Sequence, residues 1–96
     1  MLQKLKYEMV ILLDEGLNDS ELKTWAFQSA NELQKLGGSE IFVVSKGKRN
    51  LSYPIKRQDK SNFIEFNFCI SPKELKKFNS TVALDTNVVR SLILKK

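Results

Sequence analysis

Two hydrophobic periodicities alternate along this chain of 96 residues, and their order restricts the folds that it can adopt. Four segments are rich in β-branched, aromatic and other apolar residues, with the clearest period of two at residues 63–70, and in two others the apolar residues recur at every third or fourth position. Strands are therefore expected at residues 6–13, 40–55, 63–70 and 88–95, and helices at 18–36 and 71–82. The predicted order of elements is strand, helix, strand, strand, helix, strand.

Both predicted helices carry local start signals. Asn18 with Glu21 three residues later forms the pattern of a capping box. Ser71, Pro72 and Glu74 offer an N-cap, a first-turn proline and a second capping box. The first helix is expected to end at the glycine pair 37–38, and its buried stripe to comprise Leu22, Trp25, Ala26, Ser29, Leu33 and Leu36.

This order of elements predicts an α+β fold, the ferredoxin-like βαββαβ sandwich. Right-handed crossovers place both helices on one face of a four-stranded antiparallel sheet with strand order 4-1-3-2. The second strand is then an edge, where Pro54 is tolerated, and Gly47 suggests a bulge within it. The segment 57–62, RQDKSN, is expected to form the turn before the third strand. The length fits one domain, residues 1–96.

The net charge of the chain is confined to one segment. Residues 46–60 hold six cations against Asp59, whereas the remainder holds ten cations and ten carboxylates. The net charge of +5 is therefore local. A single basic segment on a neutral domain indicates a polyanion partner, with nucleic acid the first candidate, although a solvated hairpin tip remains the alternative.

The residue types that are absent argue against catalysis. The chain has no histidine and a single cysteine, so it lacks a Cys/His zinc cluster and a histidine-activated nucleophile. Cys69 lies in a strand pattern and is interpreted as a packing residue. The longest apolar run, residues 9–13, is far too short to cross a bilayer. No enzyme activity, cofactor, metal, small-molecule substrate or membrane contact is expected.

Three blocks of the sequence, YEMVILLDEGL, GKRNLSYPIKR and LDTNVVRSLIL, occur in the order and spacing of a known family. The chain resembles the bacterial-type small-subunit ribosomal protein six over nearly its whole length. The most specific block is carried by Gly47, Lys48, Arg49, Leu51, Tyr53, Pro54, Ile55 and Lys56. Departures from the family pattern are Ser52, the hairpin tip and Thr86.

The resemblance implies a non-catalytic protein that binds small-subunit ribosomal RNA together with small-subunit ribosomal protein eighteen in the platform region. Cations along the extended edge would then follow the RNA backbone, while Leu51, Tyr53 and Ile55 anchor that edge to the protein. An apolar part of the uncovered sheet face would pack on the partner protein. The RNA-binding residues expected on this interpretation are Lys4, Lys6, Tyr7, Lys46, Lys48, Arg49, Lys56, Arg57, Lys60, Arg90, Lys95 and Lys96.

Two other classes share this fold. An RNA recognition motif would fit the third-strand sequence FIEF, but residues 59–62, DKSN, depart from the first half of its signature. An acylphosphatase-type enzyme would hold phosphate in the loop DEGLNDS, where Asp14 and Glu15 would repel it. Thirteen lysines against three arginines suggest an AT-rich genome, and we expect a plastid (chloroplast) stroma ribosome, with the bacterial cytoplasm as the alternative.

Overall fold

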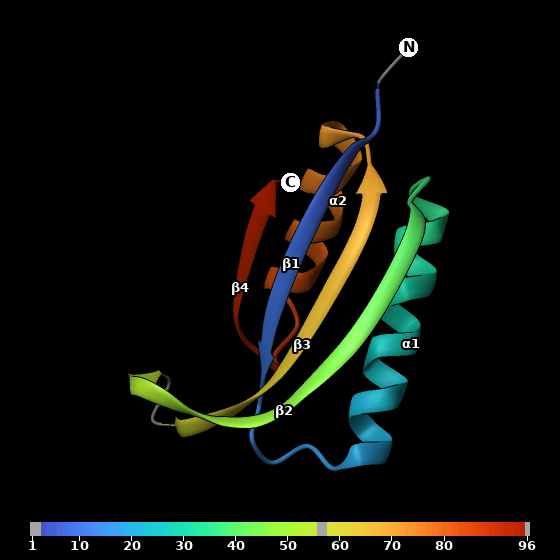
Figure 1. Ribbon diagram of the computed structural model, residues 1–96. Coiled ribbons are helices and arrows are strands. Elements are labelled where there is room, and N and C mark those ends of the chain that lie inside the picture. The colour runs from blue at the N-terminus through green and yellow to red at the C-terminus, as the bar shows by residue number, and fades with distance from the viewer. Residues whose placement is uncertain (1–2, 56–57, 96) are drawn as a thin grey trace.

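The fold combines one sheet with two helices on one of its faces (Figure 1). The computed structural model describes the backbone of residues 3–55 and 58–95 and the side chains of residues 3–51 and 59–95. Its elements are β1 (Leu5–Leu13), α1 (Asp19–Lys35), β2 (Ser39–Ile55), β3 (Gln58–Ile70), α2 (Pro72–Ala83) and β4 (Val88–Lys95). The sheet is antiparallel with strand order β2-β3-β1-β4. The predicted ferredoxin-like βαββαβ architecture is confirmed.

The helices begin at the residues that the sequence predicts. The side chain of Asn18 accepts the backbone N–H of Glu21 at 2.8 Å, and the carboxylate of Glu21 accepts the N–H of Asn18 at 3.0 Å, which completes a capping box. At the start of α2, the hydroxyl of Ser71 accepts the N–H of Glu74 at 3.4 Å. The carboxylate of Glu74 forms an ion pair of 3.3 Å with Lys77.

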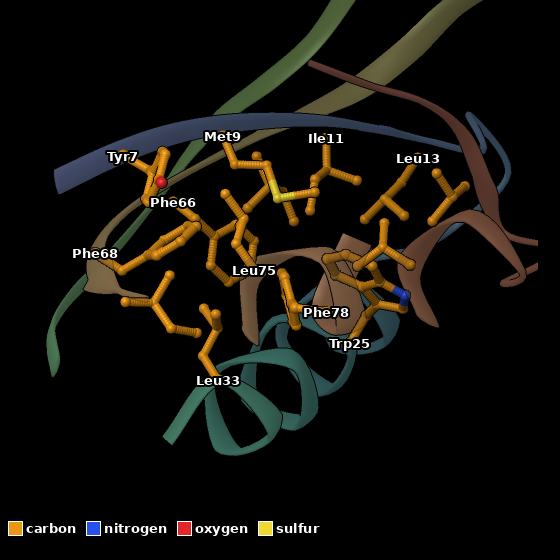
Figure 2. Packing of buried hydrophobic residues seen from close by; sticks show 14 residues of the cluster. Tyr7, Met9, Ile11, Leu13, Trp25, Leu33, Phe66, Phe68, Leu75 and Phe78 are labelled. Atoms are coloured by element: carbon orange, nitrogen blue, oxygen red, sulfur yellow. The ribbon is translucent and has the colours of Figure 1, made fainter. Parts of the chain in front are cut away.

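The core lies between the sheet and the helices (Figure 2). Alternate residues of the two central strands point into it: Met9, Ile11 and Leu13 from β1, and Ile64, Phe66, Phe68 and Ile70 from β3. Trp25 of α1 meets Phe66 edge-on with ring centroids 6.1 Å apart. Phe78 of α2 meets Phe68 in the same manner at 6.3 Å. Trp25 is therefore a core residue, as its place in the helix stripe predicts.

The β2–β3 hairpin is longer than the sequence pattern suggests. The polar segment 57–62 was expected to form a turn, but β3 already begins at Gln58. Lys60 pairs with Asn50, and Ser61 pairs with Arg49. The turn prediction is wrong for residues 58–62 because the weak strand preference of polar residues is overridden by pairing with the long strand β2. The edge position of β2 is confirmed, and it explains why Pro54 is tolerated.

The second face of the sheet is called here the open face, because both helices pack on the other side (Figure 1). Its exposed apolar side chains belong to the two edge strands: Phe42 and Val44 on β2, and Leu92 and Leu94 on β4. Between them the central strands present polar residues, Glu8 on β1 and Glu65 and Asn67 on β3. Val10 lies beside Glu65, and Leu12 and Phe63 follow at the hairpin end, so the open face is apolar at both margins and carries a mixed polar and apolar band between them.

Candidate nucleic-acid interface

The basic segment occupies the outer part of the β2–β3 hairpin. This hairpin bends and extends away from the helices, beyond the lower end of the sheet in the view of Figure 1. Lys46, Lys48 and Arg49 on β2 and Lys60 on β3 are exposed there. Lys56 and Arg57 of the predicted site lie outside the described residues. The described cations of this segment thus gather on one projecting hairpin.

A β-bulge at Gly47 decides which of these side chains share a face. Ser45 is paired with Ile64, but Gly47, two residues later, is paired with Phe63, so Lys46 is one residue in excess on β2. Gly47 has a φ of 83°, which favours glycine. The extra residue reverses the alternation beyond it and brings Arg49 to the open face. The bulge predicted from Gly47 is confirmed.

Arg49 and Lys46 make specific contacts on that face. The Nε–H of Arg49 donates to the carbonyl oxygen of Lys46 at 3.3 Å, and the guanidinium carbon lies 5.8 Å from the ring centroid of Phe63. The Nζ of Lys46 lies 3.1 Å from a carboxylate oxygen of Glu65. The bond to Lys46, together with a hydrogen bond from Asn67, holds the pKa of Glu65 below its ordinary value.

The remaining predicted RNA-binding residues fall into two groups. Arg90 on β4 is paired with Leu12, which on its other side is paired with Phe63, so Arg90 belongs to the hairpin end of the open face. Lys4, Lys6 and Lys95 lie at the opposite end of the sheet, where the Nζ of Lys4 is 3.5 Å from the hydroxyl of Ser39 and Lys95 is paired with Tyr7. Lys96 lies outside the described residues. The structure therefore divides the predicted site between the two ends of the sheet.

Tyr7 differs from the other predicted residues because its ring lies in the core. It is 7% exposed, and its ring centroid is 6.2 Å from that of Phe68 (Figure 2). Phe63, in contrast, was absent from the predicted site, although it lies directly beneath Arg49. The only sequence signal for this contact is the glycine at position 47, because it indicates that the alternation of β2 reverses.

Cys69 is on the open face and is half-buried. Its thiol donates to a carboxylate oxygen of Glu40 at 2.9 Å, and this bond, with burial, raises the pKa of the thiol. Among the described residues, no three metal-ligating side chains of the His, Cys, Asp and Glu types are gathered into a possible metal site. Within the same residues, no helix has the length and apolar character needed to span a membrane.

Comparisons with known proteins agree on one family. The family model of ribosomal protein S6 matches residues 6–95. The small ribosomal subunit protein bS6c of Trieres chinensis is 57% identical over 91 residues, which are 95% of each chain. The bS6c protein of Phaeodactylum tricornutum is 48% identical over 95% of this chain and 93% of its own. The 30S ribosomal protein S6 of Thermotoga maritima shares the fold with a TM-score of 0.90, at 14% identity over 98% of this chain and 89% of that chain.

Fold and comparisons together define a non-enzymatic structural protein of the small ribosomal subunit. The chain belongs to the ribosomal protein S6 family, as its sequence motifs suggest. The bS6c relatives at 48% and 57% identity place it in the plastid ribosome. The plastid assignment drawn from residue usage is confirmed, and so is the absence of an enzyme role.

Proposed function

We propose that this chain binds small-subunit ribosomal RNA through the projecting β2–β3 hairpin and binds ribosomal protein eighteen through the open face of the sheet. The observation that carries the RNA part is the confinement of the net charge of +5 to residues 46–60. Phosphate contacts from such a segment supply affinity without reading the base sequence. Lys46, Lys48, Arg49 and Lys60 are the described residues of this contact surface.

The open face supports the protein partner by its exposed apolar area. Phe42 is 66% exposed, Leu94 is 59% exposed and Leu92 is 49% exposed, and all three point to the same face. The carboxylates of Glu8 and Glu65 lie between these apolar margins. A partner surface that is apolar at its edges and carries cations opposite these two carboxylates would complement this face.

The direct test of the RNA contact is the salt dependence of binding. Replacing Lys48, Arg49, Lys56 and Arg57 with glutamine should weaken binding to a transcript of the plastid small-subunit ribosomal RNA. The slope of log K against log salt should fall in magnitude by about three units, because each phosphate contact contributes ~0.7 to 0.9.

A variant with the same charge loss on the helices serves as the control. Lys23, Lys73, Lys76 and Lys77 are all exposed on α1 and α2, and their replacement with glutamine should leave most of the slope in place. If the slope of log K against log salt is unchanged in the hairpin variant, the basic segment is a solvated hairpin tip and does not contact RNA. Both variants should remain folded, since exposed substitutions alter stability by within about 0.5 kcal/mol.

The partner part is tested by measuring the same RNA affinity with and without ribosomal protein eighteen. The isolated chain offers six localised cations, which meet phosphates and do not read bases, so it is expected to bind RNA weakly and with little sequence preference. Addition of the partner should tighten binding markedly. Equal affinity in both conditions would refute the cooperative role. Co-sedimentation of the tagged chain with the small subunit of plastid ribosomes tests assembly in the source organelle.

A further inference from the structure

Arg49 occupies a more ordered setting than a charge in a basic segment requires. Its Nε–H is held at 3.3 Å by the carbonyl oxygen of Lys46, within its own strand. Its guanidinium lies over the ring of Phe63 on the adjacent strand, with 5.8 Å between the guanidinium carbon and the ring centroid. A cation at this distance from an aromatic face is attracted by the ring quadrupole. The side chain is therefore restrained from two directions.

The local geometry of the hairpin is suited to this arrangement. Because of the bulge at Gly47, Arg49 rather than Lys48 shares the face of Phe63. The residue directly across from Arg49 is Ser61, which is small and fully buried. Phe63 is the next residue of β3 on the same face, at the diagonal distance that a long side chain reaches. A glycine, a serine and a phenylalanine thus give the arginine a defined path along the sheet.

We propose that Phe63 is a positioning residue for RNA binding, which holds the guanidinium of Arg49 ready to receive a phosphate. This inference rests on the proposed RNA-binding function and names one working contact within it. With Nε–H engaged by the backbone, the two terminal Nη groups form the fork that meets two phosphate oxygens side by side. The ring supplies orientation, and the arginine supplies charge and hydrogen bonds.

The chemical reason for such an arrangement is entropic. A free arginine side chain has many rotamers, and fixing it upon binding lowers the affinity. An arginine already held over a ring and tied through Nε loses less freedom when it binds. Removing the ring while keeping an apolar side chain should therefore weaken RNA binding by roughly two- to tenfold, the range expected for immobilising one side chain.

The test is a double-mutant cycle on Phe63 and Arg49 with the full chain, ribosomal protein eighteen at a fixed saturating concentration, and a transcript of the plastid small-subunit ribosomal RNA. Phe63→Leu should weaken binding by roughly two- to tenfold and leave the salt slope unchanged, because Arg49 still reaches its phosphate. Arg49→Gln should weaken binding and reduce the magnitude of the slope by about 0.7 to 0.9. In the Arg49→Gln background, Phe63→Leu should have no further effect on affinity.

Two variants separate positioning from packing. Phe63→Tyr retains an aromatic face and should bind RNA like the wild type, whereas Phe63→Leu keeps an apolar side chain without the ring and should not. A role in apolar packing alone predicts wild-type RNA binding for both. Phe27→Leu makes the same change as Phe63→Leu at a side chain that is 69% exposed on α1 and should leave RNA binding unchanged. Thermal melts of every variant establish that each is folded at the temperature of the binding assay.

The outcomes distinguish this inference from the proposed function. Phe63→Leu could bind RNA as tightly as the wild type, or it could lose the same affinity in the Arg49→Gln background as in the wild type. Either result would overturn the positioning role and leave RNA binding by the hairpin intact. A wild-type chain that binds the ribosomal transcript no better than an unrelated RNA, with a salt slope that the quadruple hairpin variant does not change, would overturn both.

Discussion

The indole Nε1–H of Trp25 donates to Oδ2 of Asp85 over 2.8 Å, and this bond joins α1 to the loop that leads into β4. The other carboxylate oxygen of Asp85 accepts the backbone N–H of Asn87 at 2.8 Å. One carboxylate therefore satisfies a largely buried ring nitrogen and orders the turn before the last strand. Residues that lie 60 positions apart in the chain are linked by this contact.

Asp85→Ala should lower the free energy of unfolding by about 1–2 kcal/mol, because it leaves the indole N–H without its acceptor and removes the support of the turn. The melting temperature should fall by several degrees, at ~4–8 °C per kcal/mol for a domain of this size. Asp85→Asn keeps an acceptor oxygen and should lose less. Denaturant and thermal unfolding check the order of the three proteins, and equal stability of Asp85→Ala and wild type would contradict it.

The arrangement of helices and strands could be predicted because local signals and periodicity agree with the tertiary fold. Asn18 and Ser71 cap the helices whose apolar stripes face the sheet, and residues 63–70 alternate without interruption. The prediction was wrong at residues 58–62, where polar residues continue a strand. Pairing with β2 determines the structure of that segment, and no property of the segment itself reveals it.

The candidate site was predictable in its charge and not in its geometry. The cations of residues 46–60 are visible in the sequence, but which of them share a face depends on a one-residue bulge. The contact between Arg49 and Phe63 also joins two strands whose register is set by the whole hairpin. Similarly, Arg90 falls in the row of Phe63 only through pairing across β1.

The ion pair of Lys46 and Glu65 predicts a pH-dependent contribution to stability. Because the pKa of Glu65 is lowered in the folded protein, its contribution is present above the pKa of the unfolded chain and is lost as the pH falls through the folded pKa. Lys46→Gln should therefore lower the melting temperature slightly at neutral pH and have no effect in strong acid. Melts of the two proteins across this pH range check it, and a difference that persists in acid would contradict it.

The thiol of Cys69 should react slowly with alkylating reagents at neutral pH. Its hydrogen bond to Glu40 raises its pKa, so little thiolate is present. Glu40→Gln should lower that pKa and speed alkylation by iodoacetamide. The alkylation rate is measured by mass spectrometry across a pH series. Lys6 acts in the opposite direction, so Lys6→Gln should slow the reaction further. This account of the thiol would be refuted if Lys6→Gln were alkylated faster than the wild type, or if Glu40→Gln were alkylated no faster than the wild type.

Gly47 and Gly37 form a matched pair that separates backbone strain from function. Both have positive φ, 83° and 89°, and an added Cβ would meet no atom within 4 Å at either position. Substitution of either by alanine should cost about 1 kcal/mol, because only the backbone conformation is unfavourable. Gly47→Ala should also weaken RNA binding, because the strain favours pairing without the bulge and so turns Arg49 away from the face of Phe63, whereas Gly37→Ala after α1 should not. Unfolding curves and RNA titrations on both variants decide the matter: equal losses of stability with unequal losses of RNA affinity are expected, and equal RNA affinities would show that the bulge has no part in binding.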